Sequence, residues 1–422
     1  MLNEATAVRR QRGLEIAATT AITRTGEGEW LVPSQSGGSQ YRVIKDTGGF
    51  QCSCPDYELR VDTCKHGFAV EFVLRRETRP DGTVIETRAA RVTYPQNWPA
   101  YNRAQTSEKA QFCVLLRDLV ADVPTPEQKR GRPSLPLSDM IFSAAFKVYS
   151  TVSGRRFMTD LADAQDAGLI DRTPHYNSIF NVLDREDVTP ILTELITRSA
   201  LPLRSLETEF AVDSTGFGIQ AFYRHFSAKY GRDMERRDYL KLHVMVGTKT
   251  NVITAAAVTD RHTNDSPILP ALLNETATYF PVKEVSADKG YSSKKNLAVI
   301  TGFGATPFVA FKRNTTGDTG SRIWNKAFHF FLMNQDEFQA RYHRRSNVES
   351  TFSAIKRKLG DTLRSKTPIA QRNELLLKAL CHNLICLIHE IHESGAIALF
   401  QSLTEGCTNN RKAAQKPTYE TV

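Results

Sequence analysis

Residues 208–312 carry a series of strand patterns interrupted by helical ones, and this series limits the possible fold more than any other part of the chain. The strand patterns are FAVDST, the alternating LKLHVMV, then NVITAAAVT, VSAD and ATPFVAF. Helical patterns at 266–279 and 293–301 precede the last two strands. Three consecutive strands followed by alternating helices and strands predict a mixed α/β sheet. Residues 313–335 are predicted to be irregular, and two further helices follow, the second ending near Ser394.

Two of these strand patterns end in an acidic residue. Asp213 closes FAVD in the first strand, and Asp288 closes VSAD in the fourth. If these strands are neighbours, both aspartates reach the same edge of the sheet, and the following helix can bring Glu349 over it. Three carboxylates without Cys or His form a hard oxygen site suited to Mg²⁺ or Mn²⁺. A single Asp at a strand end is more often a turn former or a helix cap, so the prediction rests on all three acids together.

The third acid lies in the segment YHRRSNVESTFSAIK, which is predicted to be helical. Its apolar residues share one face, so this helix can dock against a core. Next to that face, four polar side chains fall within an arc of about 60°: Tyr342, Arg345, Glu349 and Lys356. A lone acid on a basic, hydrogen-bonding stripe suits a site that handles phosphate and a metal ion.

Three blocks of the sequence together resemble a known family. The blocks are AVDSTG, SADKGY and the spacing Y-x2-R-x3-E-x6-K, and they resemble the catalytic blocks of DDE transposases of bacterial insertion sequences, in the group with the Tyr-Arg-Glu-Lys signature. The resemblance covers roughly 208–390, and LKALCHNLICLI is similar to the family's final helix. It implies an RNase H-like catalytic domain in which two Mg²⁺ or Mn²⁺ ions are held by a triad: Asp213, Asp288 and Glu349. It also implies that basic and hydrogen-bonding residues of the same segment hold DNA phosphates: Tyr342, Arg345 and Lys356, with Arg344 from the same basic cluster.

The reaction that this resemblance implies is two-metal phosphoryl transfer on double-stranded DNA. An activated water cuts at the terminal repeats of a mobile element, and the freed 3′-hydroxyl attacks target DNA. Because two ends must be paired, a homodimer on DNA is expected. Two alternatives stay open: a zinc-dependent DNA-binding protein derived from such an enzyme, and an RNase H-like nuclease that cuts without strand transfer.

A compact group of cysteines and a histidine lies near the N-terminus. Its order is C-x-C, nine residues, then C-x-H, formed by Cys52, Cys54, Cys64 and His66. Three thiolates and one imidazole fit a structural, tetrahedral Zn²⁺ with no position left open for catalysis. Short strands before the group and the helix-like HGFAVEFVL after it make the region similar to a SWIM zinc finger.

The region between this zinc-binding part and the sheet contains two candidate DNA-binding features. Lys-Arg-Gly-Arg-Pro at 129–133 resembles the core of an AT-hook, in which Arg130 and Arg132 lie in an A·T minor groove. A solvated basic linker is the alternative. The helical stretch 135–205 could house a helix-turn-helix, with HYNSIFNVLDR as its second helix, or serve as a spacer or a dimerising unit.

Polar residues near the predicted triad are not assigned to it. His243 is expected to be a packed or hydrogen-bonded strand residue, and Asp265 is expected to cap a helix that begins at Ser266 or Pro267.

Composition excludes some classes of protein. The net charge of +9 favours a polyanionic partner. No stretch approaches the roughly 18 uninterrupted apolar residues of a membrane span, and the N-terminus lacks an apolar signal core. The odd count of seven cysteines argues against a disulfide framework. A cytoplasmic, nucleoid-associated protein is therefore expected, with five parts: a β-rich SWIM-type domain (1–90), a Pro-rich basic linker (91–134), a helical domain (135–205), the catalytic domain (206–395) and a partly disordered tail (396–422).

Overall fold

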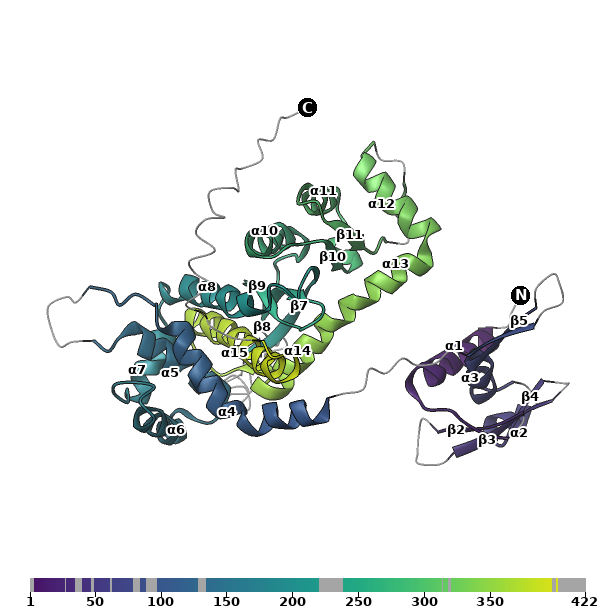
Figure 1. Cartoon of the computed structure of the whole chain (residues 1–422). Helices are drawn as coiled ribbons and strands as arrows, with labels where there is room; N and C mark the ends of the chain where they lie inside the picture. The colour runs from purple at the N-terminus through teal and green to yellow at the C-terminus, as the bar shows by residue number, and fades with distance from the viewer. Residues whose placement is uncertain are drawn as a thin grey trace, which may run out of the picture. The chain divides into compact units, whose positions relative to one another are not determined.

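The computed structural model divides into two units, residues 1–96 and 97–422 (Figure 1). We describe each by itself. The structure describes residues 4–26, 28–34, 40–46, 49–60, 63–78, 84–88, 97–127, 134–219, 238–312, 314–317, 320–396 and 400. The AT-hook-like Arg130 and Arg132, and the C-terminal tail beyond residue 400, lie outside these ranges.

The N-terminal unit is built on an antiparallel sheet of four strands: β1 (Thr23–Gly26), β2 (Glu29–Pro33), β3 (Gln40–Asp46) and β4 (Gly49–Cys52). The short helix α2 (Pro55–Arg60) follows, then α3 (Lys65–Val73) and the hairpin of β5 (Leu74–Thr78) and β6 (Val84–Arg88). Trp30, Val32 and Val43 form part of its core.

The sequence predicted a β-rich unit here, but it opens on a helix, α1 (Glu4–Thr19), packed against α3. Gly13 interrupts an otherwise helix-forming segment for a steric reason. A Cβ at Gly13 would lie 2.6 Å from the Cβ of Phe68, so only glycine lets the two helices approach this closely.

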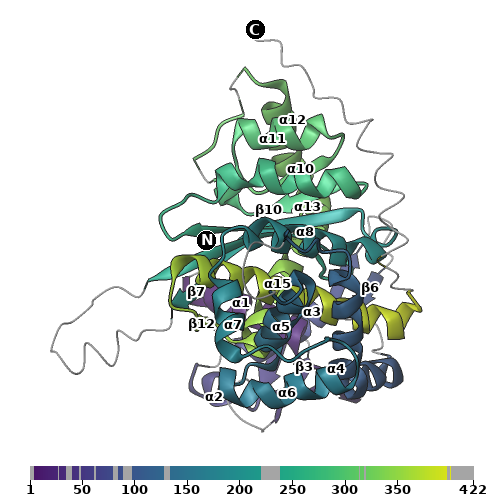
Figure 2. The ribbon, with the colours of Figure 1, turned by 90° about the vertical axis from the view of Figure 1, so that its left-hand side faces the viewer.

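The second unit contains a mixed sheet in the order β11-β10-β7-β8-β9, which confirms the predicted mixed α/β class. The first three strands along the chain form an antiparallel meander, while β10, β11 and the short β12 run parallel to their neighbours. The sheet lies between α10 and α11 on one side and α14 and α15 on the other (Figures 1 and 2). The strands are β7 (Glu209–Ile219), β8 (Tyr239–Gly247), β9 (Ile253–Asp260), β10 (Glu284–Ala287), β11 (Thr306–Val309) and β12 (Thr362–Leu363).

Helices surround this sheet and share its core. They are α4 (Trp98–Val120), α5 (Leu137–Ser150), α6 (Gly154–Asp166), α7 (Tyr176–Leu183), α8 (Val188–Ala200), α10 (Leu269–Tyr279), α11 (Lys294–Gly302), α12 (Arg322–Met333), α13 (Gln335–Tyr342), α14 (Ser346–Leu359) and α15 (Pro368–Ser394).

The predicted separation of a helical domain at 135–205 is wrong in this structure. Helices α4, α5, α7 and α8 pack on α15, and their apolar residues join those of the sheet in one cluster. Buried Asn383 on α15 shows the connection, because its amide nitrogen bonds the carbonyl oxygens of Ile196 on α8 at 3.1 Å and of Ile253 on β9 at 2.7 Å. The helices are therefore part of the same unit as the sheet.

The structure contains the second helix of the helix-turn-helix predicted within 135–205, but not its short turn. Helix α7 forms as predicted, but residues 167–175 separate it from α6. A helix-turn-helix uses a turn of about three or four residues, so this connection is too long.

Residues 91–134 were predicted to be a loose linker, yet most of them form the long helix α4. Of the prolines that suggested a linker, Pro99 lies in the first turn of this helix and Pro124 and Pro126 follow its end. The missing N–H of Pro99 is not needed in the first turn, and the side chain of Asn97 caps the helix by accepting from Ala100 N at 3.2 Å. Phe112 and Leu116 are buried in the shared core.

The segment 313–335, predicted to be irregular, contains α12. Ser321 caps this helix through its hydroxyl, which accepts from Trp324 N at 3.4 Å. The apolar face of α12 surrounds Phe311, whose ring centroid lies 5.0 Å from that of Trp324 and 5.3 Å from that of Phe328. Trp324 and Phe328 lie one turn apart, so the helix places both rings on the face that packs on Phe311.

Helix α15 is long and apolar enough to cross a membrane by length and composition, but 67% of its most apolar stretch is buried inside the protein. Lys378 illustrates the setting, because its buried ammonium donates to the carbonyl oxygens of Leu359, Gly360 and Thr362. These features are those of a core helix. Its end at Ser394 agrees with the prediction.

Candidate functional site

The register of two parallel strands brings Asp213 and Asp288 side by side. Strand β10 pairs with β7 so that Ala287 lies opposite Val212, and the next residue on each strand is the aspartate. This confirms the predicted neighbourhood of the two strands. One detail differs: β7 does not end at Asp213 but continues to Ile219, paired with β8 and then β12.

The backbone after β10 holds the carboxylate of Asp288 in place. Its Oδ1 accepts a hydrogen bond of 2.7 Å from Gly290 N in the turn that follows. A Cβ at Gly290 would lie only 2.9 Å from the same oxygen. The glycine of the SADKGY block is therefore required for the close approach of backbone to carboxylate.

The predicted helix that carries Glu349 is divided into three parts. Helix α13 ends at Tyr342, a 3₁₀ turn covers His343–Arg345, and α14 begins at Ser346. The apolar face of α14 docks on the core as predicted, through Val348, Phe352, Ile355 and Leu359.

Arg345 connects the helix to the sheet edge. Its Nη1 lies 2.7 Å from Asp213 Oδ2, and its Nη2 lies 2.7 Å from Glu349 Oε1. One guanidinium thus bridges two of the three predicted metal ligands. The side chain of Asp213 is 21% exposed and that of Glu349 is 60% exposed, so the bridge lies at the surface of the sheet edge.

The electrostatic balance at Asp213 indicates that the acids lie near one another. Burial raises the pKa of Asp213, the Ser214 backbone N–H and Arg345 lower it, and the nearby charges of Asp288 and Glu349 raise it again, with a net upward shift. A nearby cation would stabilise the ionised form of a carboxylate that is disfavoured by burial and by neighbouring negative charges.

The donor set fits a divalent ion, but the three carboxylates do not converge here. Within the described ranges, only the Cys/His group near the N-terminus brings three or more such ligand atoms within 4.8 Å of one another. The guanidinium of Arg345 bridges Asp213 and Glu349 and offsets part of their negative charge. A metal ion held by both carboxylates would need this guanidinium to move aside.

An open recess of ≈ 640 Å³ is lined by two of the acids, Asp213 and Glu349. Lys356 lines it and donates to Thr215 Oγ1 at 2.6 Å, with its ammonium 5.2 Å from the centroid of the Phe217 ring. Burial lowers the pKa of Lys356. The sequence prediction missed other lining residues: Ser214, Thr215, Ser353, Arg357 and Asp361. Ser214 and Arg357 directly follow the predicted residues Asp213 and Lys356.

Tyr342 lies beside the acids, as the spacing predicted. Its ring stacks on Phe338 with centroids 5.4 Å apart, and the guanidinium of Arg345 lies 5.8 Å from its centroid. Burial raises the pKa of the Tyr342 hydroxyl, so it is a neutral hydrogen-bonding group at physiological pH.

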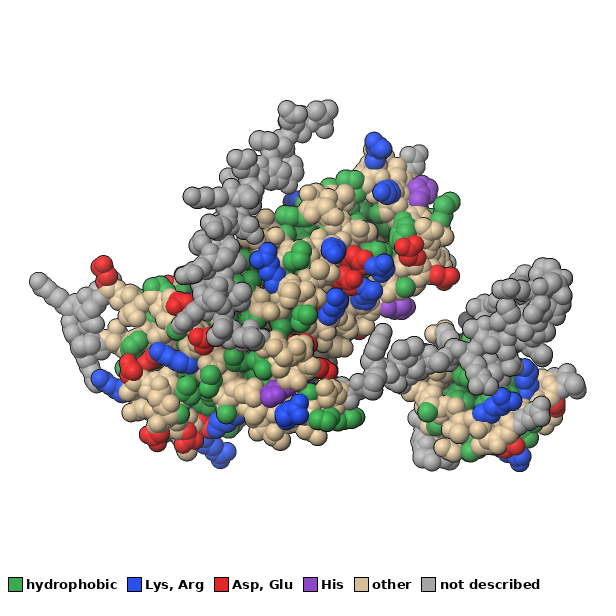
Figure 3. All heavy atoms as spheres, in the orientation of Figure 1, with side chains coloured by type: hydrophobic (Ala, Val, Ile, Leu, Met, Phe, Trp, Pro, Cys, Tyr) green, Lys and Arg blue, Asp and Glu red, His purple; other side chains and the backbone are tan. Residues whose placement is uncertain are grey.

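Arg344 does not join this group. It pairs with Glu209 and Glu284 at the opposite ends of β7 and β10, and Arg341 also pairs with Glu284. In Figure 3, basic and acidic side chains lie together over the region of α13. These ion pairs attach the helix to the sheet, and they give Arg344 partners within the chain.

His243 is buried, as predicted, with Nε2 2.7 Å from Thr259 Oγ1. Asp265 does not cap the helical turn that it precedes, because its side chain makes no capping hydrogen bond. Its carboxylate instead accepts from Lys241 Nζ at 2.9 Å.

The four predicted zinc ligands converge in the N-terminal unit. All are buried, and their ligand atoms lie within 4.8 Å of one another. His66 Nδ1 lies 3.8 Å from Cys52 Sγ and 3.9 Å from Cys64 Sγ. A tetrahedral zinc with Zn–S bonds of about 2.3 Å and a Zn–N bond of about 2.0 Å requires separations of about 3.5–3.8 Å, so the group fits the ion.

Comparisons with known proteins bear on the second unit. Residues 204–384, fewer than half of the 422, match the family described as transposase DDE domain. This range includes all three acids and the Tyr-Arg-Glu-Lys spacing, and the match supports a DDE transposase. No curated protein sequence matches the chain.

One solved structure is similar in outline: the cryo-EM structure of a piggyBac transposase synaptic complex with hairpin DNA. It is 12% identical, and the match covers 79% of this chain and 84% of that one with a TM-score of 0.32. A likeness this low carries no argument about the present chain.

Proposed function

We propose that this protein is a DNA transposase of the bacterial insertion-sequence type, which cleaves the terminal repeats of a mobile element and joins them to target DNA. The observation that carries the proposal is the β7–β10 register, which sets Asp213 beside Asp288, together with the Arg345 bridge that ties Glu349 to Asp213. The family match over residues 204–384 supports the same assignment. An RNase H-like catalytic core with an Asp-Asp-Glu triad is consistent with the mixed sheet.

In this proposal, Asp213, Asp288 and Glu349 hold two Mg²⁺ or Mn²⁺ ions. Bound ions of this kind supply an activated oxygen nucleophile and stabilise the leaving oxygen at phosphorus. Arg345 now pairs with Asp213 and Glu349, and if those carboxylates held metal it would be free to contact a DNA phosphate.

Lys356, in the recess, and Tyr342, next to Arg345, are proposed to position the DNA backbone. Lys356 already lines the recess next to Asp213, and the neutral hydroxyl of Tyr342 can donate to a phosphate oxygen. Arg344 is a weaker candidate for DNA contact, because DNA would have to compete with Glu209 and Glu284. Arg130 and Arg132 are proposed minor-groove contacts on sequence grounds alone.

The N-terminal unit is proposed to be a SWIM-type finger with a structural Zn²⁺ on Cys52, Cys54, Cys64 and His66. Support comes from the convergence of the four ligand atoms and from the short strands and α3 around them. The ion would hold β4 to α3, and the finger would bind DNA or protein. Two copies of the whole chain are expected to pair two DNA ends.

Cleavage of the element's own ends tests this function. Purified protein is incubated with Mg²⁺ and DNA that carries the sequences flanking its gene, and products are mapped to the nucleotide. We expect cuts at the element ends and joined products with target DNA. Asp213→Asn, Asp288→Asn and Glu349→Gln should each abolish both while leaving the protein folded.

A matched control is Glu337→Gln, which alters an exposed acid on α13 away from the recess and should leave cleavage unchanged. Cleavage without joined products would favour the nuclease alternative. DNA binding without any Mg²⁺-dependent cleavage would favour the non-enzymatic one. Full cleavage by Asp213→Asn or Glu349→Gln would contradict the triad.

A further inference from the structure

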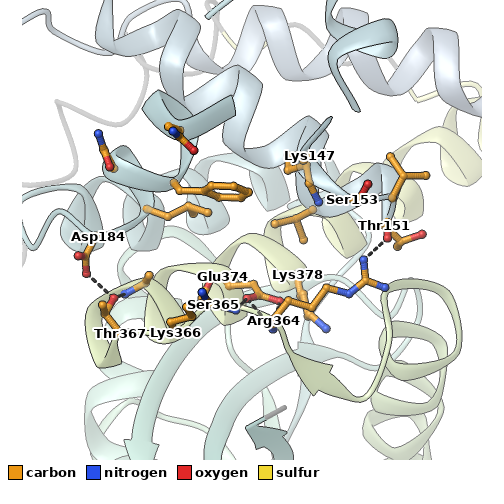
Figure 4. A pocket seen from close by; sticks show the side chains of 18 of the residues that line it. Lys147, Thr151, Ser153, Asp184, Arg364, Ser365, Lys366, Thr367, Glu374 and Lys378 are labelled. Atoms are coloured by element: carbon orange, nitrogen blue, oxygen red, sulfur yellow. Dashed lines mark hydrogen bonds between the residues drawn. The ribbon is translucent and has the colours of Figure 1, made fainter. Parts of the chain in front are cut away.

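A second hollow in the larger unit is lined by none of the residues assigned to the proposed chemistry. It measures ≈ 610 Å³ and lies between α5, α6 and α7 and the segment that leads into α15 (Figure 4). A cavity of this size suits a small molecule. Part of its wall is apolar: Val148, Val152, Phe180, Leu183 and Leu359.

Lys147 on α5 extends into this cavity (Figure 4). The residue is 9% exposed, and its ammonium makes no hydrogen bond or ion pair with any residue that the structure describes. Burying an ammonium without a partner costs free energy. Burial and the nearby charge of Arg364 lower the pKa of Lys147, and the charge of Glu374 offsets part of this shift. Such a group is better explained by a ligand than by packing.

The acid whose charge acts on Lys147, Glu374, also binds backbone N–H groups. The buried carboxylate of Glu374 accepts from Arg364 N at 3.0 Å and from Ser365 N at 2.7 Å. Lys378 in turn has its three donors on backbone carbonyls. Four basic side chains (Lys147, Arg364, Lys366 and Lys378) line the cavity against two acids, Asp184 and Glu374, so the charge of its lining is net positive.

The cavity is also lined by the start of α6, a helix of 13 residues. Ser153 precedes it and makes no capping hydrogen bond with its side chain, so first-turn N–H groups are not satisfied by that hydroxyl. The N-terminal end of a helix is electropositive and suits a phosphate group. This end lies in the same cavity as the unpartnered lysine.

The opposite wall suits a planar, partly polar group. Phe180 is 43% exposed, and its ring packs against Gly154, where a Cβ would lie 2.7 Å from the ring's Cζ. Asn177 and Asn181 stand one turn apart on α7 and line the same space. Their amides can donate and accept hydrogen bonds at the edge of a base.

We propose that this cavity binds a nucleoside phosphate, with the phosphate at Lys147, Arg364 and the start of α6, and the base against Phe180 and the two asparagines. The proposal is independent of the cleavage site, and it does not require the triad to be active. The nucleoside phosphate could be a free nucleotide or the 5′-phosphorylated end of a DNA strand.

Titration calorimetry of the full chain without divalent metal tests this proposal. The probes are adenosine monophosphate, adenosine and inorganic phosphate. We expect the monophosphate to bind most tightly, and Lys147→Met to weaken its binding by about tenfold or more, since a hydrogen bond to a charged group is lost. Lys295→Met, an exposed lysine on α11 away from the cavity, is the matched control and should bind like the wild type.

A thermal melt without ligand shows whether Lys147 serves to bind a ligand or to stabilise the fold. Lys147→Met should raise the midpoint, because it removes a buried charge that lacks a partner, whereas a structural lysine would lower it on removal. A competition experiment distinguishes the two possible ligands. Displacement of the monophosphate by a 5′-phosphorylated oligonucleotide would identify the end of a DNA strand as the ligand, and failure to displace it would identify a free nucleotide.

Three results would overturn the proposal: equal binding by Lys147→Met and wild type, equal binding of adenosine and its monophosphate, or no binding at all.

Discussion

Asp213 lies where the structure's stability and its proposed chemistry conflict. Its carboxylate is largely buried at a sheet edge beside two further acids, and burial is the main cause of its raised pKa. Arg345 relieves only part of the repulsion. A fold with no need for a cation at this position would be more stable with a neutral side chain there. We infer that the acid is retained for what it binds.

The pH dependence of stability should show this conflict. The ionised carboxylate is disfavoured in the folded state, so stability falls as pH rises from the ordinary Asp pKa of about 3.9 through the raised folded-state pKa. Asp213→Asn removes this loss. We expect its thermal midpoint to exceed that of the wild type near neutral pH, and the difference to vanish at about pH 3, where both side chains are neutral.

Scanning calorimetry across this pH range without divalent metal measures the effect. Asp336→Asn, an exposed acid on α13, serves as the control and should show no comparable gain. A midpoint for Asp213→Asn at or below that of the wild type near neutral pH would mean that the Arg345 pair outweighs burial.

At the scale of elements, the predictions succeeded where one local pattern decided the structure. The alternating LKLHVMV became β8, and the apolar spacing of α14 produced the docked face that it predicted. The predictions failed where one local sequence pattern is compatible with two different structures. Prolines near α4 mark its ends rather than a linker, since proline is as compatible with a first helical turn as with a loop.

The sequence analysis also failed to predict helix α1. The contact between α1 and α3 can be tested at Gly13. Gly13 weakens the helical signal, yet it permits the contact with α3. Gly13→Ala should destabilise the N-terminal unit by about 1–3 kcal/mol, because a Cβ would overlap Phe68 and the carbonyl oxygen of Lys65, 2.8 Å away. Hydrogen exchange of α1 and α3 in the full chain measures this, and both helices should exchange faster.

Gly26→Ala is the matched control for this change. A Cβ there would meet nothing closer than 3.8 Å, and the substitution should leave exchange in both helices close to that of the wild type. Unaltered protection in Gly13→Ala would show that the two helices can separate without cost.

At the scale of the whole molecule, the two units have separate hydrophobic cores. The core of the N-terminal unit is small and includes the three clustered cysteines, whereas the second core joins helices and sheet from residue 104 to residue 400. A small unit with few buried apolar side chains depends strongly on any structural metal. The larger unit has no such dependence in the part of the chain that the structure describes.

Metal removal should therefore unfold one unit and spare the other. With a strong zinc chelator, or in Cys64→Ser, we expect amides of β2, β3 and α3 to lose protection from hydrogen exchange, while those of β7 and α15 keep theirs. Peptide-level exchange on the full chain reads both units in one experiment. Equal protection of the N-terminal unit with and without chelator would argue against a structural zinc.

The sequence by itself determined the features that depend on neighbours along the chain. These include the mixed α/β class, the four clustered metal ligands, the apolar face of α14 and the position of Asp288 directly after its strand, because strand and helix periodicity and ligand spacing are local properties. Only the tertiary structure decided which distant parts meet. The β7–β10 register, the Arg345 bridge, the separation of Arg344 from the acids and the single core shared by helices and sheet all depend on contacts between residues far apart in sequence, which local patterns cannot specify.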